Sequence, residues 1–397
     1  MDNAKKDLLF IMNNLDCGGA EKALLSLLET IDYSRYNVDL FLFEHKGIFL
    51  SQVPQKVSLL TPPEVYPYFN MSIKKALLLC LKRRQWSIFF SRIGFGYLQK
   101  TEKESAVKEQ KSWKYLKRVL PSLPKQYDVA VGYLEKTPNY FCVDKVHSKL
   151  KLGFIHNDYN QLKMDVSFDY PYFSKLDKII TVSEECKSVL NRNFPTLSDK
   201  FHVMYNIIST TAISNLSKVP LDFNKKGITL MSVGRLHFQK GYDLALEACK
   251  ILVDKGIPFY WYVLGDGEER EKLQKQIVAY NLQEHFILLG LQDNPYSYLA
   301  HADIFVHTAR FEGFGIVISE AKIMKLPMVI TNFNIAQSHI EHGKNGLIAQ
   351  MNPESIAANL ERLLLDSSLR AAFSKSLSEN NYGTESEINK FYELIEL

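Results

Sequence analysis

Short apolar runs alternate with amphipathic helical patterns along the chain, and this alternation limits the possible folds more than any other feature. Asp7 to Met12 reads as a buried strand, Gly18-Gly19 as a tight turn, and Ala20 to Ile31 as a helix with leucines on one face. Further strands are predicted at 37–43, 128–132, 152–155 and 178–182. Strands that alternate with helices predict a parallel sheet covered by helices on both faces.

The same pattern starts again at residue 227. It predicts strands at 227–233, 259–264, 286–289, 304–307, 327–331 and 346–348, and helices at 242–255 and 268–280. The sequence therefore predicts an α/β protein with domains over 1–205 and 227–379. The polar segment 206–226 is expected to be the linker, and a helix at about 380–397 is expected to pack back on the first domain. Two such domains are expected to enclose a ligand cleft at the carboxyl ends of their strands.

Composition places the chain among globular proteins. It has 397 residues, of which 46% are hydrophobic and 23% charged, which suits two domains. No segment offers the roughly 18 apolar residues that suggest a membrane span, and the run from Leu8 to Met12 is too short for a signal peptide. The five cysteines are scattered without a C-x-x-C pair, which argues against disulfides and a zinc site. The cytosol is the expected compartment.

The motif with the strongest chemical signal runs from Arg310 to Glu320. Glu312 lies in the loop after a predicted strand, Gly313 and Gly315 flank Phe314, and a helix is expected to begin near Ile316. Glycines allow a ligand to approach the backbone at the positive end of a helix. Two carboxylates on either side of that turn could accept hydrogen bonds from the hydroxyls of a sugar and a ribose. The alternative is a helix start with two solvated acids.

A second loop after the strand 227–233 contains Arg235 and Lys240, the latter just before Gly241. Two cations beside a glycine turn suit a diphosphate, with Arg acting as a planar fork and Lys as a point charge. They would neutralise a leaving group without a metal ion. A pair of basic residues on a surface is also common, so this loop alone is weak evidence.

Two candidates lie in the first domain. The Gly18-Gly19 turn could present backbone N–H groups to a ligand, although it lacks the full G-x-G-x-x-G pattern and such turns are mostly structural. His156 follows a predicted strand and could bond a sugar or acceptor hydroxyl, while a structural role is the more frequent one for a single histidine.

Together these motifs resemble the retaining glycosyltransferases of family 4, which have the GT-B fold. The matching stretches are the GGAE turn at 18–21, the G-R-L-x-x-x-K-G pattern at 234–241, and the two glutamates Glu312 and Glu320 followed by Ala321. The Ile-His-Asn-Asp stretch at 155–158 and Thr181-Val-Ser-Glu184 are also similar, above all to members that build bacterial capsules and exopolysaccharides. The likeness is close over 228–350 and thin over 50–125. One departure is Tyr205-Asn-Ile-Ile208, where many relatives have Asn-Pro.

The resemblance implies a role for each matching residue. Arg235 and Lys240 would hold the donor diphosphate, Glu312 would contact the transferred sugar, and Glu320 the ribose. The backbone at Gly18 and Gly19 would lie near the phosphates, with His156 beside the sugar. The remaining donor contacts are expected from the Gly313-Phe314-Gly315-Ile316 turn and, for the base, from Gly290-Leu291.

The expected function is a retaining, metal-independent hexosyl transfer. The donor would be a nucleotide-diphosphate sugar with UDP favoured, the acceptor a glycan or a polyprenyl-diphosphate-linked oligosaccharide, and no cofactor is expected. A sugar-nucleotide epimerase or phosphorylase on the same architecture is one alternative. A non-catalytic partner subunit of a transferase is another.

Basic residues gather between Ser72 and Arg118, where 13 Lys and Arg face 3 acids. The basic residues Lys74, Lys75, Lys82, Arg83, Arg84 and Arg92 alternate with the apolar residues Leu77, Leu78, Leu79, Trp86, Ile88, Phe89 and Phe90. Interfacial helices have this mix, which predicts contact with an anionic membrane surface and a peripheral location on the inner face of the cell membrane. The alternative is a core-facing helix with solvated charges. Nucleic acid is not an expected partner, because no binding module accompanies the charge.

Overall fold

The computed structural model describes residues 5–16 and 18–396. These residues form two compact α/β units, each built on a parallel sheet. Unit 1 comprises residues 5–16, 20–205 and 386–396, and unit 2 comprises 18–19 and 206–385. Cys17, one of the five cysteines, lies outside the described residues, and the other four are buried free thiols. The predicted α/β class with two parallel-sheet units is confirmed.

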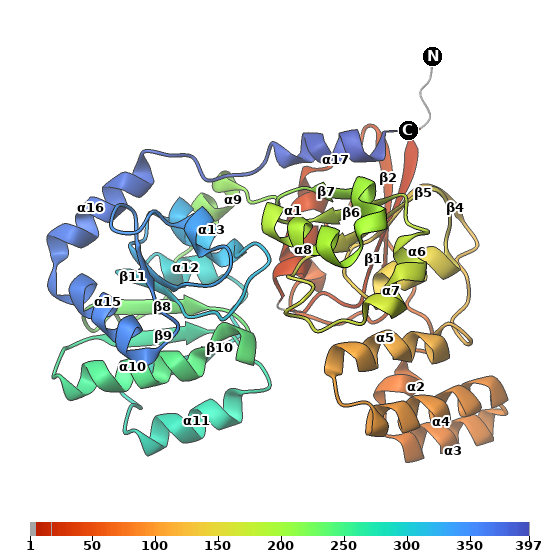
Figure 1. Ribbon diagram of the computed structural model, residues 1–397, viewed down its shortest axis with the longest axis horizontal. Helices are drawn as coiled ribbons and strands as arrows, with labels where there is room; N and C mark the ends of the chain where they lie inside the picture. Colours follow the sequence, from red (N-terminus) through yellow and green to blue (C-terminus); the bar gives the residue numbers. More distant parts are fainter. Residues whose placement is uncertain (1–4, 17, 397) are drawn as a thin grey trace. The chain divides into compact units, whose positions relative to one another are not determined.

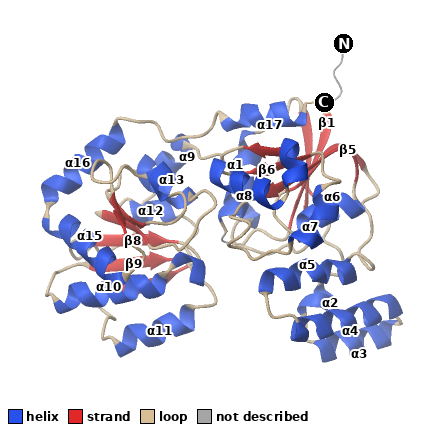
Figure 2. Cartoon of the chain, viewed as in Figure 1, coloured by secondary structure: helices blue, strands red, loops and turns tan. Residues whose placement is uncertain are grey.

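Unit 1 has a seven-stranded sheet in the order β3-β2-β1-β4-β5-β6-β7, and every strand pairs in parallel with its neighbours. Helices lie on both sides of the strands (Figures 1 and 2). The strands are β1 Lys6–Met12, β2 Tyr36–Leu42, β3 Val57–Leu59, β4 Gln126–Gly132, β5 His147–Ile155, β6 Lys178–Thr181 and β7 Phe201–Val203. The helices are α1 Gly19–Thr30, α2 Pro67–Asn70, α3 Ile73–Arg83, α4 Trp86–Thr101, α5 Ser105–Leu116, α6 Thr137–Lys145, α7 Val166–Phe173, α8 Glu184–Asn193 and α17 Glu387–Ile395.

Unit 2 repeats this plan with a six-stranded parallel sheet in the order β10-β9-β8-β11-β12-β13. Its strands are β8 Thr229–Val233, β9 Tyr260–Leu264, β10 Phe286–Gly290, β11 Ile304–His307, β12 Met328–Thr331 and β13 Leu347–Ala349. Its helices are α9 Thr210–Leu216, α10 Tyr242–Asp254, α11 Arg270–Ala279, α12 Pro295–Leu299, α13 Ile316–Ile323, α14 Ala336–His339, α15 Pro353–Leu365 and α16 Ser367–Ser378.

The central strands of unit 2 are mostly apolar because both faces of the sheet are covered. Successive residues point to opposite faces, so Leu230 packs into the cluster with α10 and α15 while Met231 packs into the cluster with α12 and α13. In the same way, Trp261 and Ile304 pack into the first of these clusters, whereas Tyr262 and Phe305 pack into the second. A strand buried on both sides therefore reads as a continuous apolar run, and that run predicts the strand.

The strand order reverses direction beside β1 in unit 1 and beside β8 in unit 2. In each case the first strand of the unit lies between the second strand and the fourth. The helices that follow the two neighbouring strands at such a switch point cover opposite faces of the sheet, and ligands of this class of fold bind at the carboxyl ends there. In unit 2 these strands are β8 and β11, and the loops that follow them contain Arg235, Lys240 and Glu312.

Residues 206–226, expected to be a linker without periodicity, include the helix α9. Ser209 caps it by accepting a hydrogen bond from the backbone N–H of Ala212 at 3.2 Å, and Ile213 is buried against unit 2. With a single buried side chain in seven residues, α9 has no amphipathic pattern to detect.

Helix α17 belongs to unit 1, although all of unit 2 precedes it in the sequence. Phe391 is fully buried and stacks on Phe10 of β1 with ring centroids 5.8 Å apart. Tyr392 stacks on Tyr36, and its hydroxyl accepts a hydrogen bond from the backbone N–H of Asp32 at 2.8 Å. Lys178 donates to the carbonyl of Leu394 at 2.6 Å. These contacts make α17 part of the unit 1 core.

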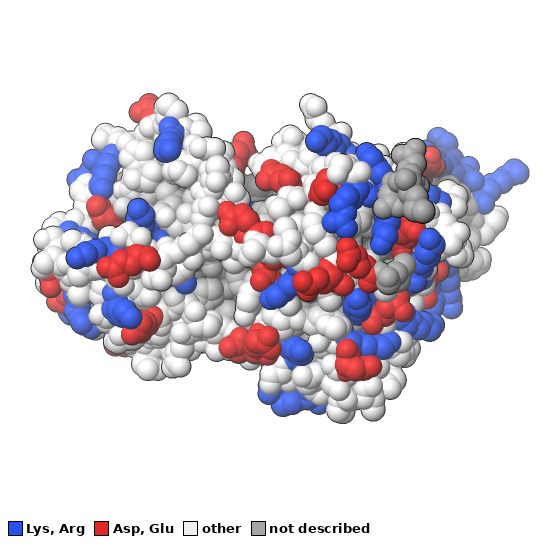
Figure 3. Space-filling model, turned by 90° about the horizontal axis from the view of Figure 1, so that it is seen from above, with Lys and Arg blue, Asp and Glu red and all other residues white. Residues whose placement is uncertain are grey.

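Charge is mixed over much of the surface. On the face that Figure 3 shows, basic and acidic side chains lie close to one another. The segment from Val65 to Thr101 differs, because it contains seven Lys and Arg and no Asp or Glu.

We predict that Phe391→Ala lowers the free energy of unfolding of unit 1 by about 3–5 kcal/mol, because it leaves a cavity between α17 and β1. Equilibrium urea unfolding measures the change. Leu365→Ala provides the matched control, since Leu365 is 68% exposed and its loss is expected to change stability by less than about 0.5 kcal/mol. An unfolding transition for Phe391→Ala that coincides with wild type would show that α17 adds nothing to the fold.

Candidate active site

The candidate site lies on two loops of unit 2 that leave adjacent parallel strands. The first follows β8 and runs from Gly234 to Gly241, and the second follows β11 and runs from Thr308 to Gly315. Because β8 and β11 pair directly, with Leu230 opposite Ile304, the two loops start side by side.

Hydrogen bonds connect the two loops along their length. The Thr308 hydroxyl donates to the carbonyl of Lys240 at 2.9 Å, the backbone N–H of Arg310 to the carbonyl of Gln239 at 2.7 Å, and the Gln239 side chain to the carbonyl of Phe311 at 2.9 Å. Arg310 adds a bidentate ion pair with Asp243, at 2.9 and 2.6 Å. The loops therefore form one rigid layer.

Gly241 is required where the loops meet. Its φ is +63°, and a Cβ at this position would lie 2.1 Å from the carbonyl oxygen of Thr308. No other residue allows this backbone conformation together with this approach at so little cost. The lysine that precedes it is thereby placed directly beside the second loop.

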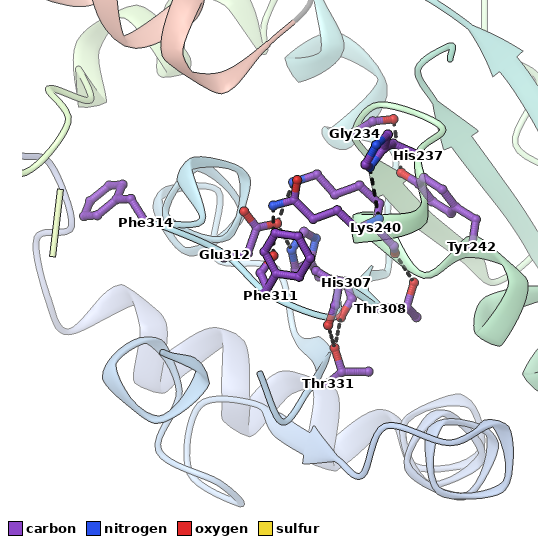
Figure 4. Close-up of polar contacts among 12 residues, drawn as sticks. Gly234, His237, Lys240, Tyr242, His307, Thr308, Phe311, Glu312, Phe314 and Thr331 are labelled. Carbon is purple, nitrogen blue, oxygen red and sulfur yellow. Dashed lines mark hydrogen bonds and ion pairs between the residues drawn. The ribbon is translucent and has the colours of Figure 1, made fainter. Parts of the chain in front are cut away.

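The centre of the site is Glu312, which is buried with 6% of its surface exposed. Its Oε1 accepts from Nζ of Lys240 at 2.5 Å and from Nε2 of His307, the last residue of β11, at 2.9 Å (Figure 4). Its backbone is held by Asn334, which accepts from the N–H of Glu312 at 3.3 Å and donates to its carbonyl at 3.1 Å. Hydrogen bonds therefore hold both the backbone and the side-chain carboxylate of Glu312.

Electrostatics keep this carboxylate ionised. Burial alone would raise the pKa of Glu312, but the charge of Lys240 and the hydrogen bond from His307 outweigh it and lower the pKa to about 2. Burial lowers the pKa of His307, and its bond to Glu312 offsets only part of that effect. Near neutral pH the cluster thus holds one ammonium, one carboxylate and one neutral imidazole that donates through Nε2.

The glycine turn of the second loop leads into α13. Gly315 has a φ of +71° and occupies the N-cap position of that helix. His339 lies 2.6 Å from the carbonyl of Phe314 through Nε2, and burial lowers the pKa of His339 to about 4, so it donates this bond as a neutral ring. Phe314 itself lies apart from the Lys240 cluster (Figure 4). Fixed in this way, the turn leaves the first N–H groups of α13 without helical partners.

Glu320, one helical turn into α13, is almost fully buried and accepts a hydrogen bond at 3.0 Å from the hydroxyl of Tyr296 in α12. The two predicted glutamates are therefore held by different partners in unit 2, Glu312 by the loops and Glu320 by a neighbouring helix.

The other predicted residues are more scattered. Arg235 is exposed on the first loop, and no acid among the described residues forms an ion pair with it. Gly290 ends β10, where its carbonyl accepts from the N–H of Gly265 at 2.8 Å, and Leu291 is 39% exposed. Gly18 and Gly19 lie where α1 begins. His156 belongs to unit 1, where it lies 3.1 Å from the carbonyl of Tyr133 through Nε2.

Sequence reasoning missed three residues that shape this site, namely His307, Asn334 and Tyr296. His307 was assigned only as the end of a predicted strand, and its position at the carboxyl edge was the available signal. Asn334 and Tyr296 follow no recognisable pattern, because each acts on a glutamate that lies more than 20 positions away.

No group of three or more His, Cys, Asp or Glu side chains between residues 5 and 396, Cys17 aside, could hold a metal ion. Within the same residues, every helix is too short or too polar to cross a bilayer.

Comparisons with known proteins agree with this geometry. Residues 215–379 match the family model described as "Glycosyl transferases group 1". An uncharacterized glycosyltransferase of Methanocaldococcus jannaschii is 32% identical over 41% of this chain and 42% of its own length. The N-acetylgalactosamine-N,N'-diacetylbacillosaminyl-diphospho-undecaprenol 4-alpha-N-acetylgalactosaminyltransferase of Campylobacter jejuni is 30% identical over 55% of this chain and 59% of its own. The chain thus spans about half the length of these relatives.

Solved structures extend the likeness over the whole chain. Anabaena HepE in complex with UDP and glucose superposes with a TM-score of 0.68 at 16% identity, covering 98% of both chains. Staphylococcus aureus TarM, in a complex that contains UDP, gives 0.68 at 16% identity and covers 99% of this chain and 100% of its own. The two parallel-sheet units therefore have the GT-B fold that the sequence predicts.

We predict that the stabilisation supplied by ionised Glu312 depends on pH. Because its pKa is about 2 in the folded state and 4.5 unpaired, the ionised group stabilises the fold at every pH above 4.5, and this contribution is lost as the pH falls from 4.5 toward 2. The difference in unfolding free energy between wild type and Glu312→Gln is expected to shrink by about 3 kcal/mol over that range. Urea unfolding at a series of pH values measures it.

Glu284→Gln, at an exposed glutamate of unit 2, is the control and is expected to stay within about 0.5 kcal/mol of wild type. A wild-type advantage over Glu312→Gln that does not change with pH would contradict the charge assignment.

Proposed function

We propose that this chain, which carries a glycosyl transferases group 1 domain over residues 215–379, moves a hexosyl group from a nucleotide-diphosphate sugar to a glycan or lipid-linked acceptor in the synthesis of a cell-surface polysaccharide. The observation that carries the proposal is the buried Lys240–Glu312–His307 cluster at the carboxyl ends of β8 and β11. In this cluster the ammonium of Lys240 can bind a phosphate, and the ionised carboxylate of Glu312 can accept a hydrogen bond from a hydroxyl.

Lys240 is assigned to the donor diphosphate. Its ammonium has three N–H donors, and the ion pair with Glu312 uses one of them. The pair holds Nζ in place while the other two donors can reach phosphate oxygens. Arg235 on the same loop adds a second cation, and its exposed guanidinium is able to close on a phosphate as a planar fork.

Glu312 is assigned to the transferred sugar as an acceptor of hydrogen bonds. Both of its side-chain contacts use Oε1, which leaves Oε2 for a sugar hydroxyl. A pKa of about 2 makes this carboxylate a poor proton acceptor. It therefore orients the sugar rather than acting as a general base.

The turn from Gly313 to Ile316 and the residue Glu320 complete the donor site. The N–H groups at the start of α13 are suited to phosphate or sugar oxygens. Tyr296 orients Glu320, which is assigned to a ribose hydroxyl. Gly290 and Leu291 at the end of β10 are assigned to the base.

The reaction is proposed to retain the anomeric configuration. The bond between the anomeric carbon and the diphosphate oxygen breaks, the acceptor oxygen bonds that carbon on the same face, and its proton passes to the departing phosphate oxygen. Lys240, Arg235 and the N–H groups at Gly18 and Gly19 stabilise the charge on the leaving group, in place of a metal ion. His156 is assigned to a hydroxyl of the transferred sugar.

The names of the compared proteins support the choice of substrates. The Campylobacter jejuni relative acts on a diphospho-undecaprenol-linked saccharide, and the HepE structure contains UDP and glucose. We assign UDP-hexose as the donor and a polyprenyl-diphosphate-linked oligosaccharide as the acceptor class, and we place the enzyme at the cytoplasmic side of the membrane that would carry such an acceptor.

We predict that Arg235→Ala lowers kcat/KM for sugar transfer about 100-fold, because the departing diphosphate loses one stabilising cation. Release of nucleoside diphosphate from UDP-hexoses in the presence of acceptor measures turnover. Lys275→Ala, at an exposed lysine of α11, is the matched control and is expected to keep wild-type turnover. Turnover of Arg235→Ala within about threefold of wild type would refute the assignment.

Lys240→Met tests the second cation in the same assay. Because it leaves a buried carboxylate without its partner, it is paired with Lys240→Met/Glu312→Gln, which removes both charges. The double variant is expected to regain stability and to remain inactive, which separates the role of the ion pair in the fold from its role in transfer.

We also predict that transfer continues after treatment with EDTA and extensive dialysis. The reason is that Lys240 and Arg235 supply the positive charge that a divalent ion would otherwise bring to the diphosphate. Turnover measured with and without added Mg²⁺ or Mn²⁺ is expected to agree within about twofold. A loss on chelation that Mg²⁺ or Mn²⁺ restores would overturn the metal-independent mechanism.

A further inference from the structure

Helices α3 and α4 form a hairpin on unit 1, and its composition is unlike the rest of the surface. The segment from Val65 to Thr101 that contains it has seven Lys and Arg and no Asp or Glu. In Figure 1 the two helices lie side by side, covered by α2 and α5 on one side only.

The inner face of the hairpin is firmly attached to the core. Ala76, Cys80 and Ile88 pack into the same apolar cluster as Ile11 of β1. The buried Arg92 donates from Nε to the carbonyl of Tyr68 at 2.9 Å and from Nη2 to that of Met71 at 2.8 Å. The orientation of α4 is therefore fixed, and so is the face that it turns outward.

That outer face of α4 is apolar. Trp86, Phe90, Ile93 and Tyr97 are 53%, 66%, 42% and 70% exposed. Their spacing of four, three and four residues places them within an arc of about 60° on the helix. Leu78 and Leu81 of α3 add two more exposed apolar side chains, at 69% and 46%. Together these six residues are called the apolar stripe.

Basic side chains border the apolar stripe. Lys74, Lys75 and Lys82 fall on either side of Leu78 and Leu81 on α3, Arg84 lies in the turn, and Lys100 follows Tyr97 by three residues. All are exposed, and no ion pair joins any of them to an acid among the described residues. These cations are thus available to an external anionic partner.

We propose that the apolar stripe and its basic border dock this protein on an anionic lipid bilayer, with α4 lying flat in the headgroup region. Leucines and aromatic rings on one face of a rigid helix enter the boundary between headgroups and acyl chains, and the surrounding lysines and arginines pair with lipid phosphates. A protein partner would need an acidic rim around an apolar groove, whereas the bilayer supplies anionic charge and an apolar interior together. The surface deepens the proposed function by bringing the enzyme to a lipid-linked acceptor.

Tryptophan fluorescence gives a direct test, because the chain has three tryptophans and Trp113 and Trp261 are fully buried. A change in emission on adding vesicles therefore reports on Trp86. With the full chain, vesicles that contain phosphatidylglycerol are expected to shift the emission to shorter wavelength and to carry the protein upward in flotation at low salt. Vesicles of phosphatidylcholine alone are expected to do neither, and high salt is expected to release the protein.

Variants of the apolar stripe and of its basic border test whether these residues make the contact with the bilayer. Phe90→Ser/Tyr97→Ser is expected to weaken binding to the anionic vesicles about tenfold or more, and Lys74→Gln/Lys75→Gln/Lys82→Gln to do the same. Val278→Ser/Leu365→Ser and Lys272→Gln/Lys275→Gln/Lys344→Gln are matched controls on exposed positions of unit 2 and are expected to bind as wild type. Because the assay contains no sugar donor, its result does not depend on whether the proposed transfer reaction is correct.

Two results would overturn the proposal. One is the absence of flotation and of an emission shift with anionic vesicles at low salt. The other is a dimer of this chain, detected by sedimentation velocity, in which the apolar stripe is the interface. In that case Phe90→Ser/Tyr97→Ser would convert the dimer to a monomer without any change in vesicle binding.

Discussion

A buried carboxylate is stable only when a positive charge inside the protein pairs with it. For Glu312 that charge is the ammonium of Lys240, which lies on a different loop. This single ion pair requires the loop after β8 and the loop after β11 to meet at one point. Gly241 makes the meeting possible, Thr308 and Gln239 hold it, and His307 supplies a second donor to the same oxygen. The start of α13 takes its position from the same loop.

The two cations that we assign to the diphosphate differ in how firmly the protein holds their side chains. Lys240 is held before any ligand arrives, so binding costs it little side-chain entropy. Arg235 is exposed and has to be ordered when the ligand binds. In the proposed complex the fixed charge of Lys240 would define the place of the phosphate, and the exposed Arg235 would adjust to it. Glu312, kept ionised by a pKa of about 2, accepts hydrogen bonds over the whole physiological pH range.

Much of the fold could be predicted because the central strands are buried on both faces and consist mostly of apolar residues. The bounds of β11 were predicted without error, and those of β8, β9 and β12 within two residues. The three-residue edge strands β3 and β7 gave no such signal, and α9 has too few buried residues to show a period. Lys240 and Glu312 could be predicted from their loops, but their contact could not, since it joins residues 72 positions apart. Tyr296 was missed for the same reason, because only the packing of α12 on α13 brings it to Glu320.

The placement of α17 also has a consequence for how the polypeptide is made. Asp32 and Tyr392 are hydrogen-bonded although they lie 360 positions apart in the sequence. Phe391 packs on Phe10 of β1, a strand that the ribosome makes near the beginning of synthesis. While the ribosome is still producing unit 2, the nascent unit 1 lacks this helix and leaves Phe10 and Tyr36 uncovered. Apart from residues 18 and 19, unit 2 consists of residues 206–385, so its core can form before α17 is made. The earlier-translated unit is therefore the later one to mature, and a chaperone that shields β1 and β2 would act in that interval.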